Sequence, residues 1–348
     1  MILVTGATGL LGSHLLYDLV SVGSEIRAIY RDKKNIQKTA QIFSYYQKDG
    51  ADLINNIEWV KADVNDICQL GEVTKNIDEV FHCAGVVSFN KRDHKRIMKT
   101  NVEGTANLLE VSMLNNVSKF CHVSSIASFG RPEKKGKTID EDVKREENEK
   151  SSVYSLSKYL AEIEVWRAIE EGLNAVIVNP STIIGSGNWK AGSSALFPRV
   201  WNGLSYYTDG VNGFVDVRDV VKIMKTLMDR NIFKEQYIVV SEHLSFKDLL
   251  SFIARNLNLK TPTIRANRIL SEFAWRLEEI RCAISKSQPV ITKESAAIAL
   301  DSQFYSNQKI REQLNLDFIP IKKSIQDTSQ NFLQPSSGFW KKTLPLSR

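Results

Sequence analysis

Three glycines spaced three residues apart follow the first apolar run of the chain. Met1–Thr5 has the character of a strand, Gly6, Gly9 and Gly12 come next, and residues 10–19 carry apolar side chains at helical spacing. In such a strand–turn–helix unit, the first glycine permits a tight turn, the second lets the backbone approach a pyrophosphate, and the third allows close helix–strand contact. The run therefore predicts a βα unit whose helix N-terminus binds a dinucleotide. The alternative is a tight turn without a ligand.

Short apolar runs alternate with amphipathic segments through the first half of the chain. This alternation indicates βαβ units, and so an α/β fold with a doubly wound parallel (Rossmann) sheet. The predicted strands are Met1–Thr5, Glu25–Tyr30, Ile57–Lys61, Glu79–Cys83, Lys119–Val123 and Ala175–Asn179.

The alternation weakens in Ser186–Ser194, where Gly, Asn, Ser and Trp gather. Irregular segments beyond the carboxyl ends of strands usually supply substrate contacts in doubly wound enzymes. We therefore expect residues 1–185, with 211–240 returning to them, to form the dinucleotide-binding domain. Residues 186–210 and 241–348 would form a smaller, mostly helical C-terminal lobe that binds the substrate.

Composition excludes several other classes of protein. The 348 residues carry a net charge of +6 without a long basic block, so we expect a small-molecule substrate and no nucleic acid. No apolar run approaches the ~20 residues that cross a bilayer, so no transmembrane segment is expected. The four cysteines are scattered without metal-ligand spacing, which predicts reduced thiols and no metal site. The first residues run straight into the glycine motif, so a cytoplasmic location is expected.

The residues after the second predicted strand bear on which dinucleotide binds. An NAD site places a carboxylate there for the ribose 2′-hydroxyl, whereas an NADP site needs a cation for the 2′-phosphate. Tyr30 stands where the acid is expected, and Arg31 follows it. A charge-assisted contact contributes about 1.5–3 kcal/mol, so Arg31 could set the preference. We predict NADP(H) as the preferred cofactor, while the neighbouring Asp32 keeps NAD(H) open.

Tyr154 and Lys158 are four residues apart in a predicted helix that begins after Ser151-Ser152 and runs to Gly172. This spacing places both side chains on one helix face. To exchange protons near neutrality, a phenol pKa must fall by about three units, or ~4 kcal/mol. One ammonium at about 4 Å supplies at most about that much at an effective dielectric of 20. Lys158 alone is barely sufficient, and a cationic oxidised nicotinamide nearby would supply the rest.

Further short motifs accompany the Tyr–Lys pair. They are Thr5–Gly12 (TGATGLLG), Asp63-Val64, His82–Gly85 (HCAG), Asn101–Thr105 (NVEGT), Val123–Gly130 (VSSIASFG), Tyr154–Lys158 (YSLSK) and Asn179–Ser181 (NPS). Each motif is unspecific alone, but together they are highly specific. The whole arrangement resembles the extended short-chain dehydrogenase/reductase family, within the NAD-dependent epimerase/dehydratase superfamily, over about Met1–Val240.

The resemblance implies a role for each catalytic residue. Ser125 should hydrogen-bond the substrate oxygen, Tyr154 should exchange its proton, and Lys158 should hold the nicotinamide ribose and lower the tyrosine pKa. Asn101 should support the site from the following helix. Because register at a strand end is uncertain, Ser124 is an alternative to Ser125.

The resemblance also implies which residues surround the cofactor. Asp63 and Val64 should flank the adenine, and Ala84 and Gly85 should line the cofactor. The full predicted set is Gly6, Thr8, Gly9, Leu10, Leu11, Gly12, Tyr30, Arg31, Asp63, Val64, Cys83, Ala84, Gly85, Tyr154, Lys158 and Pro180.

Some polar residues in these motifs also have a structural interpretation. Asp63 and Asn101 could be capping residues, which is what Asp and Asn most often are. His82 and His122 are interpreted as hydrogen-bonded core histidines rather than as catalysts. The segment Asp216–Asp219 is interpreted as a turn and helix cap.

Two departures from the family's sugar-nucleotide members bear on the reaction. Dehydratases follow the catalytic hydroxyl with Asp-Glu, whereas Ile126-Ala127 follow Ser125 here. Sugar-nucleotide enzymes tend to carry RxxNxYG after the sixth strand, whereas this chain has Asn179–Gly185 (NPSTIIG). The chain looks more like dihydroflavonol 4-reductase and 3β-hydroxysteroid dehydrogenase relatives. We predict an NADP-dependent oxidoreductase that reduces a carbonyl, or oxidises a secondary alcohol, of a mostly apolar small molecule.

Two other functions stay open. One is a sugar or nucleotide-sugar epimerase or dehydratase, and the other is a non-catalytic, NADP-sensing interaction protein on the same fold. The oligomeric state is open as well. The family often pairs through two long helices, and those around Thr100–Leu114 and Val153–Glu171 could form a homodimer.

Ala266–Ile284 is predicted to be an amphipathic helix. Its apolar stripe consists of Ile269, Leu270, Phe273, Leu277, Ile280 and Ile284. We expect the stripe to pack on the protein. A membrane-surface helix is the alternative, because Arg268, Arg276 and Arg281 lie off the stripe.

Two other segments are polar. Most residues of Arg131–Lys150 are charged, which is typical of a solvated loop. Ser336–Arg348 is expected to be a loosely held tail.

Overall fold

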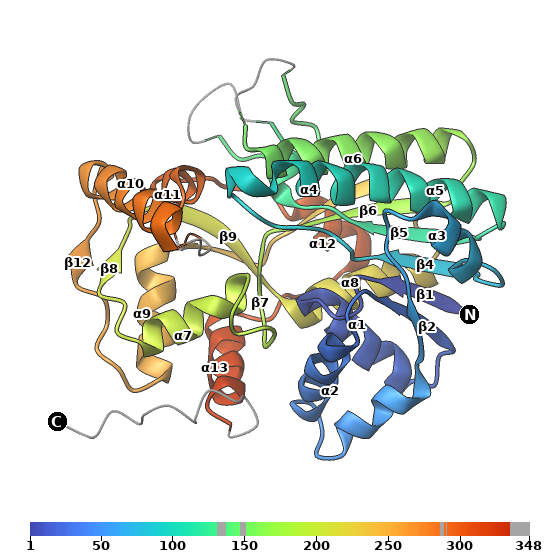
Figure 1. Cartoon of the computed structure of the whole chain (residues 1–348), viewed down its shortest axis with the longest axis horizontal. Coiled ribbons are helices and arrows are strands. Elements are labelled where there is room, and N and C mark those ends of the chain that lie inside the picture. The colour runs from blue at the N-terminus through green and yellow to red at the C-terminus, as the bar shows by residue number, and fades with distance from the viewer. Residues whose placement is uncertain (131–136, 147–150, 286–288, 290, 335–348) are drawn as a thin grey trace.

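The computed structural model describes residues 1–130, 137–146, 151–285, 289 and 291–334 (Figure 1). The predicted loop Arg131–Lys150 lies partly outside the described residues, and the predicted tail Ser336–Arg348 lies wholly outside them.

A seven-stranded parallel sheet forms the larger lobe, with the strand order β10-β6-β5-β4-β1-β2-β3. Its strands are β1 (Ile2–Thr5), β2 (Ile26–Tyr30), β3 (Glu58–Lys61), β4 (Glu79–His82), β5 (Lys119–Val123), β6 (Ala175–Pro180) and β10 (Glu235–Val239). The order reverses between β1 and β4, as in a doubly wound Rossmann sheet. The predicted fold class is confirmed, and all six predicted strands are present.

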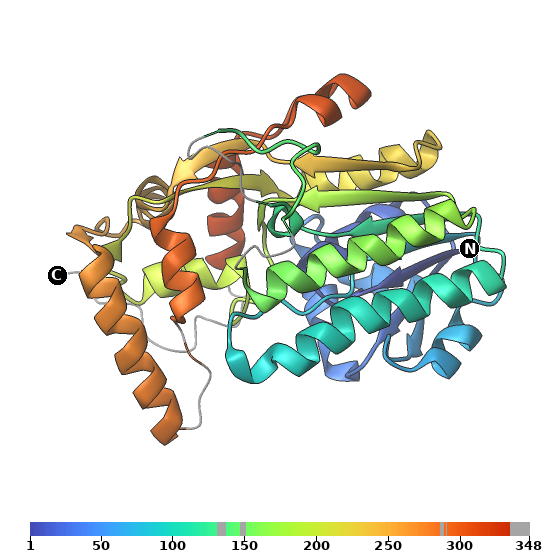
Figure 2. The ribbon, with the colours of Figure 1, turned by 90° about the horizontal axis from the view of Figure 1, so that it is seen from above.

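Helices cover both faces of this sheet (Figures 1 and 2). One face carries α1 (Leu10–Ser21), α2 (Ile36–Ser44) and α8 (Val217–Asp229), and the other carries α3 (Ile67–Val73), α5 (Gly104–Leu114) and α6 (Val153–Glu170). Because side chains alternate along a strand, Val4 and Phe81 pack on the first face and Leu3 and Val80 on the second. The central strands β1, β4, β5 and β6 are therefore buried on both faces and consist mainly of apolar residues.

The smaller lobe combines short strands with helices. A three-stranded sheet contains β7 (Thr182–Ile184), β9 (Val211–Asp216) and β11 (Glu242–Ser245), and a two-stranded ribbon contains β8 (Tyr206–Tyr207) and β12 (Ile264–Arg265). The helices are α7 (Leu196–Trp201), α9 (Phe246–Asn256), α10 (Arg268–Ser285), α11 (Lys293–Leu300) and α13 (Ile321–Phe332). A further helix, α12 (Gln308–Leu314), packs Ile310 and Leu314 into the core of the large sheet.

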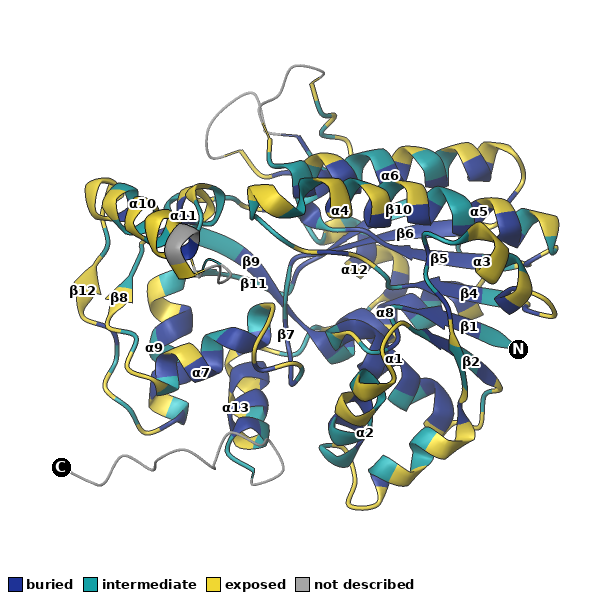
Figure 3. Cartoon of the chain, in the orientation of Figure 1, coloured by how far each residue is buried: buried dark blue, intermediate teal, exposed yellow. Residues whose placement is uncertain are grey.

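Helix α10 confirms the predicted helix, but the expectation that its apolar stripe packs on the protein is wrong. Ile269, Phe273 and Leu277 are 68%, 64% and 65% exposed. The protein covers the opposite side of the helix, where Ser271 and Cys282 are buried. Figure 3 shows α10 largely exposed at the edge of the smaller lobe.

Within the described residues, no helix combines the length and apolar character that a bilayer crossing needs.

The glycine loop has no room for extra atoms at Gly12, because a Cβ there would overlap the carbonyl oxygen of Gly6. A Gly12→Ala variant should therefore lose about 1–3 kcal/mol in the free energy of unfolding measured by urea denaturation. Gly71 in α3 is the matched control, since a Cβ there meets nothing within 4 Å. Gly71→Ala should gain about 0.5–1 kcal/mol. Equal stabilities for the two variants would contradict the close helix–strand contact.

Candidate active site

The predicted phosphate loop lies at the carboxyl edge of the sheet, between β1 and α1. Gly6 has a φ of +64°, and the Gly9 N–H donates to the Gly6 carbonyl at 2.9 Å. Gly9 begins α1 without a side-chain cap, and the first turn of the helix contains no acidic residue. A Cβ at Gly9 would meet only the Gly6 oxygen within 4 Å. This loop fits a pyrophosphate, because the helix start leaves N–H groups for an anion and one side of Gly9 is open.

Three other predicted residues of this loop differ in exposure. Thr8 and Leu10 are partly exposed, whereas Leu11 is 7% exposed and belongs to the core under the sheet. Leu11 can therefore offer a cofactor only its backbone. Leu10 packs against Gly185 and Gly187, which follow β7.

The residues predicted to contact the adenosine half of the cofactor lie at the ends of β2 and β3. Tyr30 packs edge-on against Trp59, and Arg31 is exposed. The Asp32 carboxylate caps the next turn by accepting from the Lys34 N–H at 3.0 Å, so it is already engaged. After β3, Asp63 holds its own turn by accepting from the Asn65 N–H at 3.0 Å.

Val64 lies in the loop after β3 and Pro180 ends β6, and both residues are buried. Val64 packs against Gly104, the first residue of α5, where a Cβ would lie 2.7 Å from the valine methyl group. Pro180 ends β6 opposite Val239 of β10.

The end of β4 closes over the phosphate loop. A Cβ at Gly6 would lie 2.5 Å from the carbonyl of Cys83, and the Ala84 N–H donates to Thr5 Oγ1 at 3.2 Å. Burial raises the pKa of the Cys83 thiol to about 12, so this cysteine is not a thiolate nucleophile. Gly85 lies beside the Tyr–Lys helix, since a Cβ there would be 3.4 Å from Lys158 Nζ.

Asn101 ties three segments of the site together. It lies in the π-helical turn Lys99–Glu103 that leads from α4 (His94–Met98) into α5. Its amide oxygen accepts from the Val86 N–H at 2.7 Å, and its nitrogen donates to the Val86 carbonyl and to Ser157 Oγ at 3.0 and 2.9 Å. Asn101 therefore fixes the loop after β4 against α6 rather than capping a helix.

Tyr154, Lys158 and Ser125 converge where β5 meets the start of α6. Ser152 caps the start of α6, because its Oγ accepts from the Ser155 N–H at 3.0 Å. Tyr154 and Lys158 are only 8% and 5% exposed. Lys158 Nζ donates to the Val123 carbonyl at 2.8 Å.

Burial is the largest influence on the pKa of both Tyr154 and Lys158. It lowers the pKa of Lys158 to about 8, against the attraction of Glu162. It raises the pKa of Tyr154, while a hydrogen bond with Ser125 acts in the opposite direction. The pKa of Tyr154 is therefore raised, whereas Lys158 was expected to lower it. The reason is that desolvation of the buried phenolate outweighs the other contributions.

The two serines after β5 face different partners. The Ser125 side chain contacts Tyr154 and accepts from the Ala127 N–H at 3.2 Å. Ser124 is buried, and its hydroxyl lies near enough to Glu162 to lower the pKa of that carboxyl group. The two groups do not form a close hydrogen bond. This arrangement favours Ser125 over Ser124 as the group that would reach a substrate.

Glu162 is a site residue that the sequence prediction missed. It follows Tyr154 and Lys158 at the same four-residue spacing on α6, and it is 6% exposed. Asn179 Nδ2 donates to Glu162 Oε1 at 2.5 Å and to the Ser125 carbonyl at 3.1 Å. Burial raises the pKa of Glu162. The helical period alone could have identified this residue, because it extends the Tyr–Lys face by one turn.

The two core histidines differ from each other. His82 makes the predicted hydrogen bonds, to Thr5 Oγ1 at 2.7 Å and Thr105 Oγ1 at 2.9 Å. The same prediction is wrong for His122, whose ring nitrogens have no hydrogen-bond partner among the described residues. Burial lowers the pKa of both histidines, so both rings are neutral.

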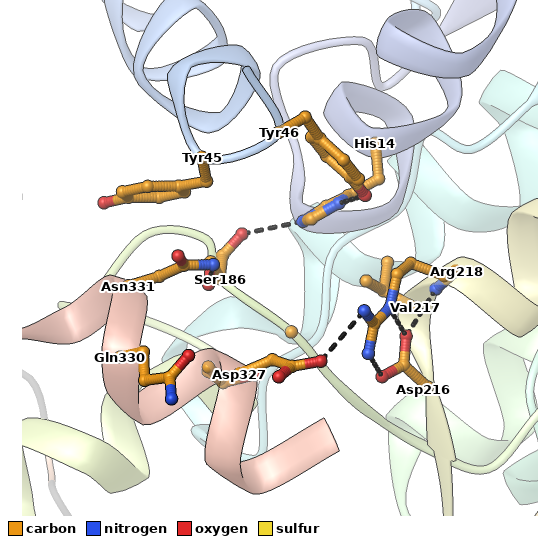
Figure 4. A pocket seen from close by; sticks show the side chains of 12 residues that line it. His14, Tyr45, Tyr46, Ser186, Asp216, Val217, Arg218, Asp327, Gln330 and Asn331 are labelled. Carbon is orange, nitrogen blue, oxygen red and sulfur yellow. Dashed lines mark hydrogen bonds and ion pairs between the residues drawn. The ribbon is translucent and has the colours of Figure 1, made fainter. Parts of the chain in front are cut away.

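A separate pocket of about 230 Å³ lies between α1, the end of α2 and α13 (Figure 4). Arg218 there is held between Asp216 and Asp327 at 2.7 and 3.0 Å. His14 bonds to Tyr46 and to the Ser186 carbonyl. Asp216 caps α8, as predicted. The pocket is lined by none of the predicted catalytic residues, and its paired charges join the two lobes.

Comparison with known proteins places this geometry in a family. The sequence model of the NAD dependent epimerase/dehydratase family matches residues 2–240. A relative described as a putative dihydroflavonol 4-reductase from Synechocystis sp. (strain ATCC 27184 / PCC 6803 / Kazusa) is 27% identical, over 93% of this chain and 92% of the relative. Sterol demethylase protein B from Methylococcus capsulatus (strain ATCC 33009 / NCIMB 11132 / Bath) is 26% identical, over 72% of this chain and 73% of that protein.

Among solved structures, the crystal structure of gox2253 is similar with a TM-score of 0.77 and 28% identity. The similarity covers 95% of this chain and 97% of that one. The relatives named as reductases and the matched family together indicate an NAD(P)-dependent oxidoreductase. Because the family model spans well over half of the sequence, the chain belongs to the NAD dependent epimerase/dehydratase family.

Proposed function

We propose that the protein is an NADP-dependent carbonyl reductase whose site consists of Ser125, Tyr154 and Lys158. The observation that carries the proposal is the convergence of these three side chains. Tyr154 and Lys158 share one buried face of α6, and Ser125 contacts Tyr154 from the end of β5. The adjacent Gly85 leaves space above Lys158 Nζ.

When bound, a reduced nicotinamide supplies a hydride from its C4 atom to the carbonyl carbon of the substrate. The Ser125 hydroxyl donates to the carbonyl oxygen and stabilises the negative charge that develops there. Tyr154 donates its proton to that oxygen, so the product is an alcohol. Lys158, as a buried cation, stabilises the resulting phenolate and offers its N–H groups to the ribose hydroxyls. Asn101 and Asn179 hold the two loops that carry these groups.

The proposed preference for NADP rests on the end of β2. Arg31 is exposed there and can approach a 2′-phosphate, whereas the Asp32 carboxylate already caps a helical turn. No acidic side chain stands directly after the strand for a ribose hydroxyl, because Tyr30 occupies that position.

The proposed substrate is a mostly apolar molecule held by residues 186–210 and 241–348. The Phe89 ring packs edge-on against Tyr154 at 5.8 Å between centroids, and Val87 beside it is 64% exposed. These side chains would offer an apolar edge to a substrate. The names of the dihydroflavonol reductase and sterol demethylase relatives also favour apolar ring compounds. A cytoplasmic location and a homodimer through α5 and α6 stay predictions.

Tyr154→Phe should lower kcat for NADPH-dependent carbonyl reduction by at least about 10²-fold, because it removes the proton donor. NADPH affinity, measured by fluorescence titration, should change little. Tyr159→Phe on the same helix is the control and should keep normal turnover. A Tyr154→Phe enzyme with unchanged kcat would overturn the proposed mechanism.

The activity should fall as pH rises through about 8, because Lys158 then loses its proton. Glu162 raises the lysine pKa, so Glu162→Gln should move this alkaline limb to lower pH while activity near pH 6.5 is largely kept. Full pH profiles of kcat test this expectation. The control is Glu164→Gln, at a partly exposed position of α6 where the carboxylate pairs with Arg167. A uniform loss of activity without a shift would assign Glu162 a structural role only.

Arg31→Ala should weaken NADPH binding about 10- to 100-fold by removing a charge-assisted contact, and leave NADH binding nearly unchanged. Dissociation constants for both cofactors, measured by calorimetry, provide the test. Lys75→Ala, at an exposed site in the turn after α3, is the charge-matched control. Equal losses for both cofactors would refute the NADP preference.

A further inference from the structure

Helix α10 turns its apolar side away from the protein. The residues of this surface, here called the α10 stripe, are Ile269 (68% exposed), Leu270 (38%), Phe273 (64%), Leu277 (65%) and Ile280 (58%). At 3.6 residues per turn, they follow one side of the helix. Exposed apolar patches of this kind on a folded chain mark an interaction surface.

Arginine side chains border the α10 stripe. Arg276 lies one turn from Phe273 and Ile280, and Arg281 lies one turn from Leu277. Both arginines are exposed, and both pair with glutamates of the same helix. The alkyl part of such a side chain can lie along an apolar surface while its charged end stays at the polar boundary. The helix itself has three Arg and three Glu, so any net positive charge comes from its surroundings.

The described residues around α10 carry a small excess of positive charge. Residues 241–285, 289 and 291–334 contain 12 Lys and Arg against 10 Asp and Glu. A more strongly basic segment, residues 91–99, has five exposed cations and one acid, Asp93. Lys91 and His94 of this segment act electrostatically on Glu294 of α11, so the segment lies near α11. Figures 1 and 2 both place α10, α11 and α4 on the same side of the molecule.

We propose that the α10 stripe docks on an anionic lipid surface. The helix would lie parallel to the membrane surface, with the α10 stripe between the headgroups and the acyl chains. Arg276 and Arg281 would lie at the level of the phosphates, and residues 91–99 would face the headgroups. A second copy is a less suitable occupant, because pairing through this face would bring two basic lobes together.

Co-sedimentation of the full chain with vesicles tests the proposal, and it needs no substrate or turnover. Wild type should bind vesicles of phosphatidylcholine and phosphatidylserine (7:3) more strongly than pure phosphatidylcholine, and 0.5 M salt should weaken this binding. Phe273→Glu together with Leu277→Glu should reduce binding at least tenfold. The matched control is Val22→Glu with Leu114→Glu, which changes the net charge equally at residues 68% and 72% exposed. This control should bind like wild type.

A second variant removes positive charge from residues 91–99. Lys95→Gln with Arg96→Gln should weaken binding about fivefold for each cation that faces the lipid and reduce its salt dependence. Thermal unfolding and NADPH binding verify that each variant is folded.

The proposal would be overturned if wild type bound neither vesicle type, or if the Phe273→Glu/Leu277→Glu variant bound like wild type. Analytical ultracentrifugation tests whether a second copy of the chain occupies the α10 stripe instead. A dimer that the stripe variant converts to monomers, without vesicle binding by wild type, would assign the α10 stripe to a contact between copies instead. Because the readout is binding alone, its failure is distinct from failure of the proposed reductase activity.

Discussion

The buried ammonium group of Lys158 is the charge on which the candidate site depends. In water an ammonium has little influence on a phenol one helical turn away, but burial makes each nearby charge and dipole act more strongly. Burial also disfavours the charged lysine, and it lowers the lysine pKa to about 8. The Val123 carbonyl and Glu162 oppose this effect, so they help to keep a cation beside Tyr154 near neutral pH.

Segments far apart in sequence supply the rest of the site because parallel strands end at one edge of the sheet. The glycine loop follows β1, Gly85 follows β4, Ser125 follows β5 and Asn179 lies in β6. Two asparagine side chains cross between these ends and fix their relative positions. Asn101 joins the loop after β4 to α6, and Asn179 joins the loop after β5 to Glu162. The candidate site is therefore held by hydrogen bonds from these side chains, to backbone and to other side chains, rather than by packing alone.

Local patterns in the sequence predicted the strands of the large sheet, because apolar runs are short-range signals. The candidate site residues were chosen from signals of the same kind, the glycine spacing and the Tyr–Lys spacing. Contacts that depend on distant segments were not predictable in this way. The strands β7, β9 and β11 were not predicted. β7 has only three residues, β11 is partly exposed along its whole length, and β9 contains Asn and Gly, so their sequences carry little apolar periodicity. The stripe on α10 predicted an amphipathic helix correctly, but such a stripe does not reveal which side the protein covers. The unpartnered ring of His122 and the raised pKa of Tyr154 likewise depend on burial, which a local pattern does not measure.

A crystal structure of the protein with NADP⁺ tests the central claim most directly. The account predicts that the pyridine ring lies beside the Tyr154 hydroxyl, that Lys158 Nζ donates to the ribose hydroxyls, and that the pyrophosphate contacts the N–H groups at the start of α1. A nicotinamide ring held away from Tyr154, or a dinucleotide bound elsewhere on the protein, would contradict it.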